Sequence, residues 1–125
     1  MKLTEWLVLY VRHKDMLDKK LVDHKEDGNM ITFTYKDRNV VGIVQEQLEV
    51  VEIKGESVIA TLHTKENVEY LANHWEQFTK HNDLTIIFAH PGRNEKLVIK
   101  PKTHATISEN VVQGLWSLSQ GVSYV

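Results

Sequence analysis

The chain has 125 residues, of which 42% are hydrophobic and 26% charged, and its formal net charge is −2. This composition is typical of a soluble globular protein and excludes a disordered chain. The small net charge argues against a general nucleic-acid binder, and the absence of cysteine excludes disulfides and cysteine zinc sites. We therefore predict a single domain over residues 1–125.

The segment Met1 to Lys14 contains an apolar run that Glu5 and Arg12 interrupt. It lacks a small-residue cleavage site and is shorter than the ~20 apolar residues of a membrane-spanning helix. We expect a cytoplasmic protein with no membrane partner.

A first helix is predicted from Glu5 to Lys20, with Thr4 as its N-cap. Its apolar face is wider than contact with one sheet requires, which indicates a second packing partner. This face comprises Leu3, Trp6, Leu7, Leu9, Tyr10, Met16, Leu17 and Leu21. His13 lies within it, where a lone histidine is usually a core or interface residue.

Alternating apolar and polar residues predict strands in the next part of the chain. The expected strands are Leu21–Glu26, Ile31–Tyr35, Val40–Gln45, Leu48–Lys54 and Ser57–His63. Short turn segments separate them at Gly28-Asn29, at Asp37-Arg38-Asn39 and at Gly55-Glu56. Such short connections favour antiparallel hairpins.

A second helix is predicted from Lys65 to His81, with Thr64 as N-cap, followed by strands at Leu84–Ala89 and Lys96–Lys100. Thr106 and Glu109 form a capping-box pattern that predicts the start of a third helix. The apolar stripe of that helix is Ile107, Val111, Leu115, Leu118 and Val122. The apolar members of these stripes and alternations predict the core, which comprises Trp6, Leu17, Phe33, Leu62, Leu71, Trp75, Phe78, Ile86, Phe88, Ile107, Leu115 and Leu118.

The order α–β(3 or 4)–α–β(2)–α predicts an α+β fold, a two-layer α/β sandwich with a mainly antiparallel sheet. This order resembles the secretion-chaperone-like architecture, in which small dimeric proteins bind partner polypeptides. The resemblance lies in element order alone and transfers no functional residue. It implies a non-enzymatic binding or assembly module that acts as a homodimer, with a protein or peptide partner.

Two groups of residues are candidates for binding. Tyr70, His74 and His81 form a polar row beside the apolar stripe of the second helix, where they would edge a groove or an interface. Trp116 lies about 100° from Leu115 on the third helix, outside the main stripe, and contributes surplus apolar surface. The alternative is that the polar row has no binding role and is simply the flank of a helix that neighbouring loops half cover.

The segment Val50 to Lys54 resembles the third strand of the PD-(D/E)XK nuclease superfamily, in which an acid and a lysine two residues apart share one face. The resemblance implies that Glu52, with Asp37 upstream, would hold Mg²⁺ and that Lys54 would activate water. The alternative function is therefore a divergent metal-dependent nuclease. Opposite charges two residues apart also decorate many exposed strands.

The histidines give no metal pattern, because His74 and His81 are seven residues apart, about 10 Å along a helix. We predict no metal and no cofactor. His63 and His90 fall at predicted strand ends, but no serine or carboxylate is placed beside them as a partner. The basic segment His90 to His104 is either an anion-binding edge or a sheet edge guarded by lysines.

Overall fold

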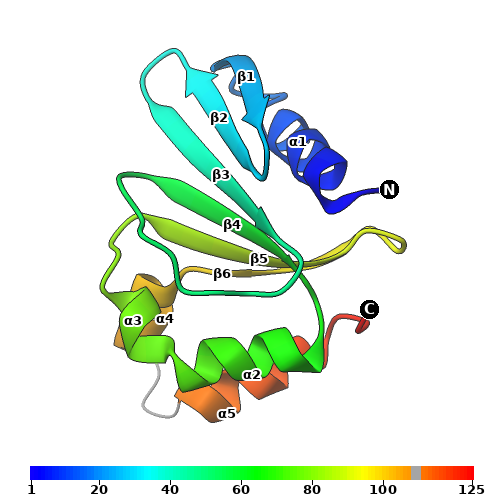
Figure 1. The fold of residues 1–125 in the computed structure, drawn as a ribbon, viewed down its shortest axis with the longest axis vertical. Helices are drawn as coiled ribbons and strands as arrows, with labels where there is room; N and C mark the ends of the chain where they lie inside the picture. Colours follow the sequence, from blue (N-terminus) through cyan, green and yellow to red (C-terminus); the bar gives the residue numbers. More distant parts are fainter. Residues whose placement is uncertain (108–110) are drawn as a thin grey trace.

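The structure, a computed structural model, describes residues 1–107 and 111–125. Its helices are α1 (Leu3–Lys14), α2 (Lys65–Asn73), α3 (Trp75–Thr79), α4 (Pro101–Ile107) and α5 (Val111–Ser119). Its strands are β1 (Leu21–Asp27), β2 (Met30–Tyr35), β3 (Asn39–Gln45), β4 (Ser57–Leu62), β5 (Leu84–His90) and β6 (Glu95–Ile99). They form one six-stranded sheet in sequence order (Figure 1).

The sheet is mixed. The strands β1, β2 and β3 form an antiparallel meander, β3, β4 and β5 run parallel, and β6 returns antiparallel to β5. The α+β class is confirmed, whereas the prediction of a mainly antiparallel sheet is wrong.

The parallel pairing arises because the segment 46–56 forms no strand, so the expected strand Leu48–Lys54 is wrong. The N–H of Leu48 donates to Asn67 Oδ1 (2.9 Å), and that of Val50 donates to the Tyr70 hydroxyl (3.1 Å). Side chains of α2 therefore replace a neighbouring strand as hydrogen-bond partners. The segment returns the chain to the other end of the sheet, and β4 then runs beside β3 in the same direction.

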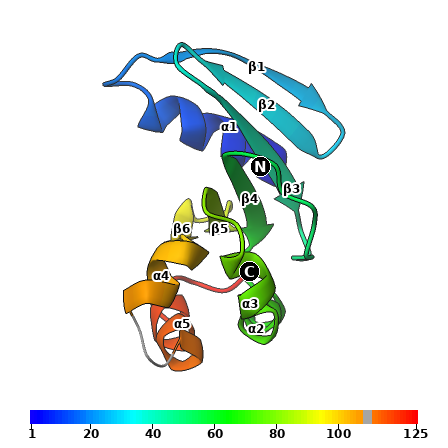
Figure 2. The same ribbon diagram turned by 90° about the vertical axis from the view of Figure 1, so that its left-hand side faces the viewer.

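Helices cover both faces of the sheet, so the layers are three and not the expected two. Buried residues of α1 pack with Ile31, Phe33, Ala60 and Ile87 on one face. Residues of α2, α3 and α5 pack on the other face, with a set of apolar strand residues: Ile43, Ile59, Leu84, Ile86, Phe88 and Ile99. Figure 2 shows the sheet between α1 and the group α2 to α5.

The first helix begins at Leu3 without a side-chain cap and ends at Lys14, not at Lys20. It ends there because the Asp15 carboxylate accepts the N–H groups of Lys20 (3.0 Å) and Leu21 (2.8 Å) and turns the chain into β1. Leu17 therefore lies beyond the helix and is 94% exposed, contrary to its predicted place in the core.

The two later predicted helices differ from their expected bounds. The predicted helix Lys65–His81 breaks at His74, whose φ of −116° and ψ of 22° are not helical, but the Thr64 cap is confirmed by its hydrogen bond to the Asn67 N–H (3.1 Å). Thr106 lies inside α4, and its predicted partner Glu109 lies outside the described residues. Leu118 was expected in the core and is 45% exposed.

Most other predicted core residues that can be assessed are buried: Trp6, Phe33, Leu71, Phe78, Ile86, Phe88 and Leu115. Trp75 and Leu62 are half-buried. Within residues 1–107 and 111–125, no helix combines the length and apolar character that crossing a bilayer requires.

Candidate functional site

The residues of the nuclease hypothesis do not share a strand. Asp37 lies in the β2–β3 turn and pairs with Lys20 (3.6 Å) and Arg38 (3.1 Å). Glu52 and Lys54 lie in the segment 46–56, where they pair with each other (3.7 Å) and are 83% and 84% exposed. The structural premise of that hypothesis, an acid and a lysine on one strand face, is therefore wrong. Across the described residues, no three His, Asp or Glu side chains gather as metal ligands.

Two of the candidate binding residues lie together. The rings of Tyr70 and His74 stack with centroids 4.0 Å apart, and the His74 Nδ1 lies 2.9 Å from the Tyr70 carbonyl oxygen. Because the Tyr70 hydroxyl also accepts the Val50 N–H, this pair supports the segment 46–56. His81 and Trp116 are half-buried, and Trp116 packs against the core. A binding role for these four residues stays a prediction.

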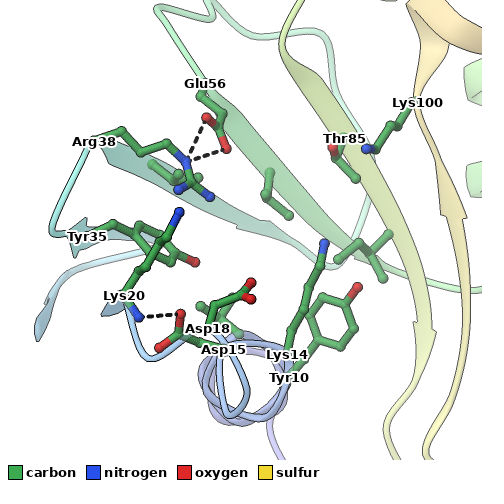
Figure 3. A pocket seen from close by; sticks show the side chains of 14 residues that line it. Tyr10, Lys14, Asp15, Asp18, Lys20, Tyr35, Arg38, Glu56, Thr85 and Lys100 are labelled. Atoms are coloured by element: carbon green, nitrogen blue, oxygen red, sulfur yellow. Dashed lines mark hydrogen bonds and ion pairs between the residues drawn. The ribbon is translucent and has the colours of Figure 1, made fainter. Parts of the chain in front are cut away.

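A charged cleft opens between the C-terminal end of α1 and the first residues of the parallel strands. It has a volume of about 360 Å³. Figure 3 shows its polar lining: Tyr10, Lys14, Asp15, Asp18, Lys20, Tyr35, Arg38, Glu56, Thr85 and Lys100. We call this the α1–sheet cleft.

One side of the α1–sheet cleft is held by Arg38. Its Nε donates to both carboxylate oxygens of Glu56 (3.1 and 3.3 Å), and its Nη1 donates to Asp37 (3.1 Å). The guanidinium carbon also lies 4.3 Å from the centre of the Tyr35 ring. Burial raises the pKa of the Tyr35 phenol, and the Arg38 charge opposes part of that rise. This side of the cleft is therefore preorganised, and its charges are paired.

The opposite side of the cleft carries Tyr10, Lys14, Thr85 and Lys100 (Figure 3). Within the described part of the chain, the ion pairs involve Lys20, Arg38 and Lys54, and none involves Lys14 or Lys100. Burial raises the pKa of the Tyr10 phenol, so that its hydroxyl stays protonated as a donor. Asp18, a carboxylate that also lines the cleft, has no ion pair among the described residues either.

A second hollow, the α1 groove, runs along the outer side of α1 beside the β5–β6 turn. Its volume is about 670 Å³, and its lining includes Met1, Leu9 and Met16, which are 68%, 50% and 63% exposed. Trp6 forms its floor, stacked on Tyr10 (5.4 Å) and hydrogen-bonded through Nε1 to Asn94 Oδ1 (3.0 Å). Exposed apolar side chains thus lie on α1 at Leu9 and just beyond its two ends at Met1 and Met16.

His63 is enclosed at the far end of the parallel strands. Its Nε2 lies 2.9 Å from the Ser119 carbonyl oxygen, and its ring stacks on Tyr124 (4.7 Å). The Val125 N–H donates to the His63 carbonyl (2.8 Å), so the C-terminal residues cover the ring. The sequence pattern placed His63 at a strand end but did not predict this cover.

No protein-family model, curated protein or solved structure matches this chain. Function must therefore be argued from the two hollows of the α1 face. The sequence pointed to Lys100, through the basic segment His90 to His104, but not to Lys14 or Arg38. These residues come from separate elements, and only the fold brings them to one cleft.

Proposed function

We propose that the protein is a non-enzymatic binding domain that assembles as a homodimer through the exposed side of α1. The proposal is supported by one observation: the exposed residues of this helix are arranged in a self-complementary order. The exposed apolar surface is of the kind that protein partners, including a second copy, cover. The absence of cysteine supports our further proposal of a cytoplasmic location.

The exposed side of α1 and its flanks is an ordered stripe. Lys2, Glu5, Leu9, His13 and Met16 are all exposed and follow one another at intervals of three or four residues. Such intervals place side chains on one line of a helix. Within α1 the line consists of Glu5, Leu9 and His13, and the exposed residues Met1, Met16 and Leu17 lie just beyond the two ends of the helix.

Two copies of this stripe match when the helices pair antiparallel about Leu9. Glu5 then faces His13 of the partner subunit, because the two lie at equal offsets from Leu9. A two-fold axis repeats each contact, which is the geometry of closed dimers. The charge pairs would set the orientation, and the covered apolar groups would supply most of the affinity.

The direct test is sedimentation equilibrium at micromolar concentration, on the full chain and on Leu9→Asp. We expect a dimer for the parent protein and a monomer for Leu9→Asp, since two carboxylates would meet at the axis. The matched control is Leu118→Asp on α5, because Leu118 is 45% exposed and Leu9 50%. That control should stay dimeric. A monomeric parent protein, or a Leu9→Asp variant that stays dimeric, would overturn the proposal.

A charge exchange tests the orientation of the helices. His13→Glu should weaken the dimer, because it places a carboxylate opposite Glu5 of the partner subunit, and Glu5→Lys should weaken it by removing the carboxylate that faces His13. The double variant restores opposite charges at both places and should recover the association constant. A double variant that is weaker than both single variants would reject the antiparallel pairing.

A further inference from the structure

We propose that the α1–sheet cleft binds a small molecule through a phosphate group. The inference takes from the proposed function only the claim that this is a binding domain, and it needs no dimer. It is carried by the charges, donors and shape of the cleft.

The charged lining of the cleft has one cation in excess, with Lys14, Lys20, Arg38 and Lys100 against Asp15, Asp18 and Glu56. Arg38 is paired with Glu56 and Asp37, and Lys20 is paired with Asp37. The carboxylate of Asp15 is occupied by the backbone N–H groups of Lys20 and Leu21. Lys14 and Lys100 have no ion-pair partner in the part of the chain that the structure describes. An anion in the cleft would pair with both ammonium groups.

The donors that remain suit phosphate better than carboxylate. A planar guanidinium is the usual partner of a carboxylate, and Arg38 already donates to Glu56. The other side offers two ammonium groups and the hydroxyls of Tyr10 and Thr85. Lysine binds phosphate as a point charge, and hydroxyl donors can be shared among three phosphoryl oxygens.

The shape of the cleft sets the size of the ligand. A volume of about 360 Å³ lies at the lower end of the range of small-molecule sites and excludes a polymer chain running through it. Figure 3 shows the two lysine side chains on the side away from Arg38 and Tyr35. The phosphate would lie at Lys14 and Lys100, and the rest of the molecule would extend toward Tyr35.

Isothermal titration calorimetry of the full chain with inorganic pyrophosphate tests the proposal, with citrate at matched ionic strength as the carboxylate probe. We expect binding of pyrophosphate and at least tenfold weaker binding of citrate. Lys14→Ala and Lys100→Ala should each weaken pyrophosphate binding by about tenfold, since each removes a charge-assisted contact. Lys14→Arg keeps the charge and should retain most of the binding.

The matched control is Lys80→Ala, which removes one exposed lysine at the end of α3 and changes the net charge equally. It should bind pyrophosphate like the parent protein. Three results would each overturn the proposal: no pyrophosphate binding at millimolar concentration, equal binding of citrate, or equal weakening by Lys80→Ala. Circular dichroism establishes that each variant folds. Sedimentation of the same samples distinguishes loss of the dimer from loss of this site.

Discussion

The two faces of the sheet are covered in different ways. On the α2–α5 face, four helices and the segment 46–56 close over the core, and side chains of α2 bind the backbone of that segment. On the other face α1 is the only helix in the part of the chain that the structure describes, and both the α1–sheet cleft and the α1 groove open beside it. A face covered by many interlocked elements stabilises the fold, whereas an incompletely covered face leaves surface that a ligand or a partner can use.

The largest effect is expected for Asn67→Ala, which tests the closed face. Asn67 is 5% exposed; it accepts the Leu48 N–H and donates to the carbonyls of Glu46 and Leu62 and to the Thr61 hydroxyl. Its removal leaves buried backbone groups without partners, and we expect a loss of about 3 kcal/mol in the free energy of unfolding. Urea denaturation measures it.

Asn73→Ala on the same helix is the control for Asn67, because Asn73 is exposed. It should change stability by less than about 0.5 kcal/mol. If both variants lose the same amount, the segment 46–56 is not held by Asn67 and the contrast between the faces fails.

Gly42→Val tests the open face at the contact between α1 and the sheet. A Cβ at this position would lie 2.9 Å from Phe33 Cε2 and 3.1 Å from Leu7 Cδ2. Overpacking of this kind costs about 1–3 kcal/mol, and we expect a value near the middle of that range by thermal or urea unfolding. Leu7→Ala in the same chain should recover part of the loss, because the two changes share one space. If the losses of stability caused by Gly42→Val and by Leu7→Ala simply add in the double variant, this packing is contradicted.

Asn94 tests the link between α1 and the β5–β6 turn. Asn94→Gly removes the hydrogen bond to Trp6 Nε1 and should cost about 1 kcal/mol. Asn94→Ala should cost more, because the φ of this residue is +52° and strains a side chain that cannot bond locally. Equal losses in the two variants would show that the turn relaxes to another backbone conformation.

The smallest effect concerns Glu95, which holds the C-terminal residues. Hydrogen bonding from Ser123 lowers the pKa of the Glu95 carboxyl below its ordinary value. The lowered pKa means that the ionised form is favoured when the tail is bound. The stabilisation of the bound tail by the Glu95 carboxylate is therefore complete above the ordinary pKa of ~4.3. It is lost as the pH falls through the lowered pKa.

Amide exchange of Ser123, followed by NMR against pH, measures this effect. Protection should decrease at acidic pH in the parent protein and should lose that pH dependence in Glu95→Gln. An unchanged pH dependence in Glu95→Gln would assign the effect to another carboxylate.

Local signals predicted the elements whose partners are close in sequence. The alternation of Ile31 and Phe33 with threonines identified β2, and Thr64 marked the start of α2. The Leu48–Lys54 prediction failed because its apolar residues pack on α2 as an irregular segment. The Asn67 side chain, nineteen residues beyond Leu48, holds this segment in its irregular conformation. A contact at that separation leaves no trace in the local alternation of apolar and polar residues. The same error hid the parallel pairing of β3 with β4.

The candidate sites were predicted less well than the fold, for a related reason. The surplus apolar width of α1 was visible in the sequence, and the exposure of Leu9 and Met16 agrees with it. The α1–sheet cleft needs Lys14, Arg38 and Lys100 from three distant segments, and their distance in space depends on strand order. His13 was expected to be a core or interface residue; its exposure excludes the core, and a place in an interface stays a prediction.

The placement of the tryptophans has an optical consequence. Trp6 lies under the α1 groove, whereas Trp75 and Trp116 pack on the opposite side of the sheet. Replacing Trp75 and Trp116 by Phe leaves one fluorophore beside Tyr10, a residue that also lines the α1–sheet cleft. The emission of that chain reports on one face alone, and the emission of Trp6→Phe reports on the other. Two emission spectra can therefore reveal whether the two faces of this small sheet unfold together or one after the other.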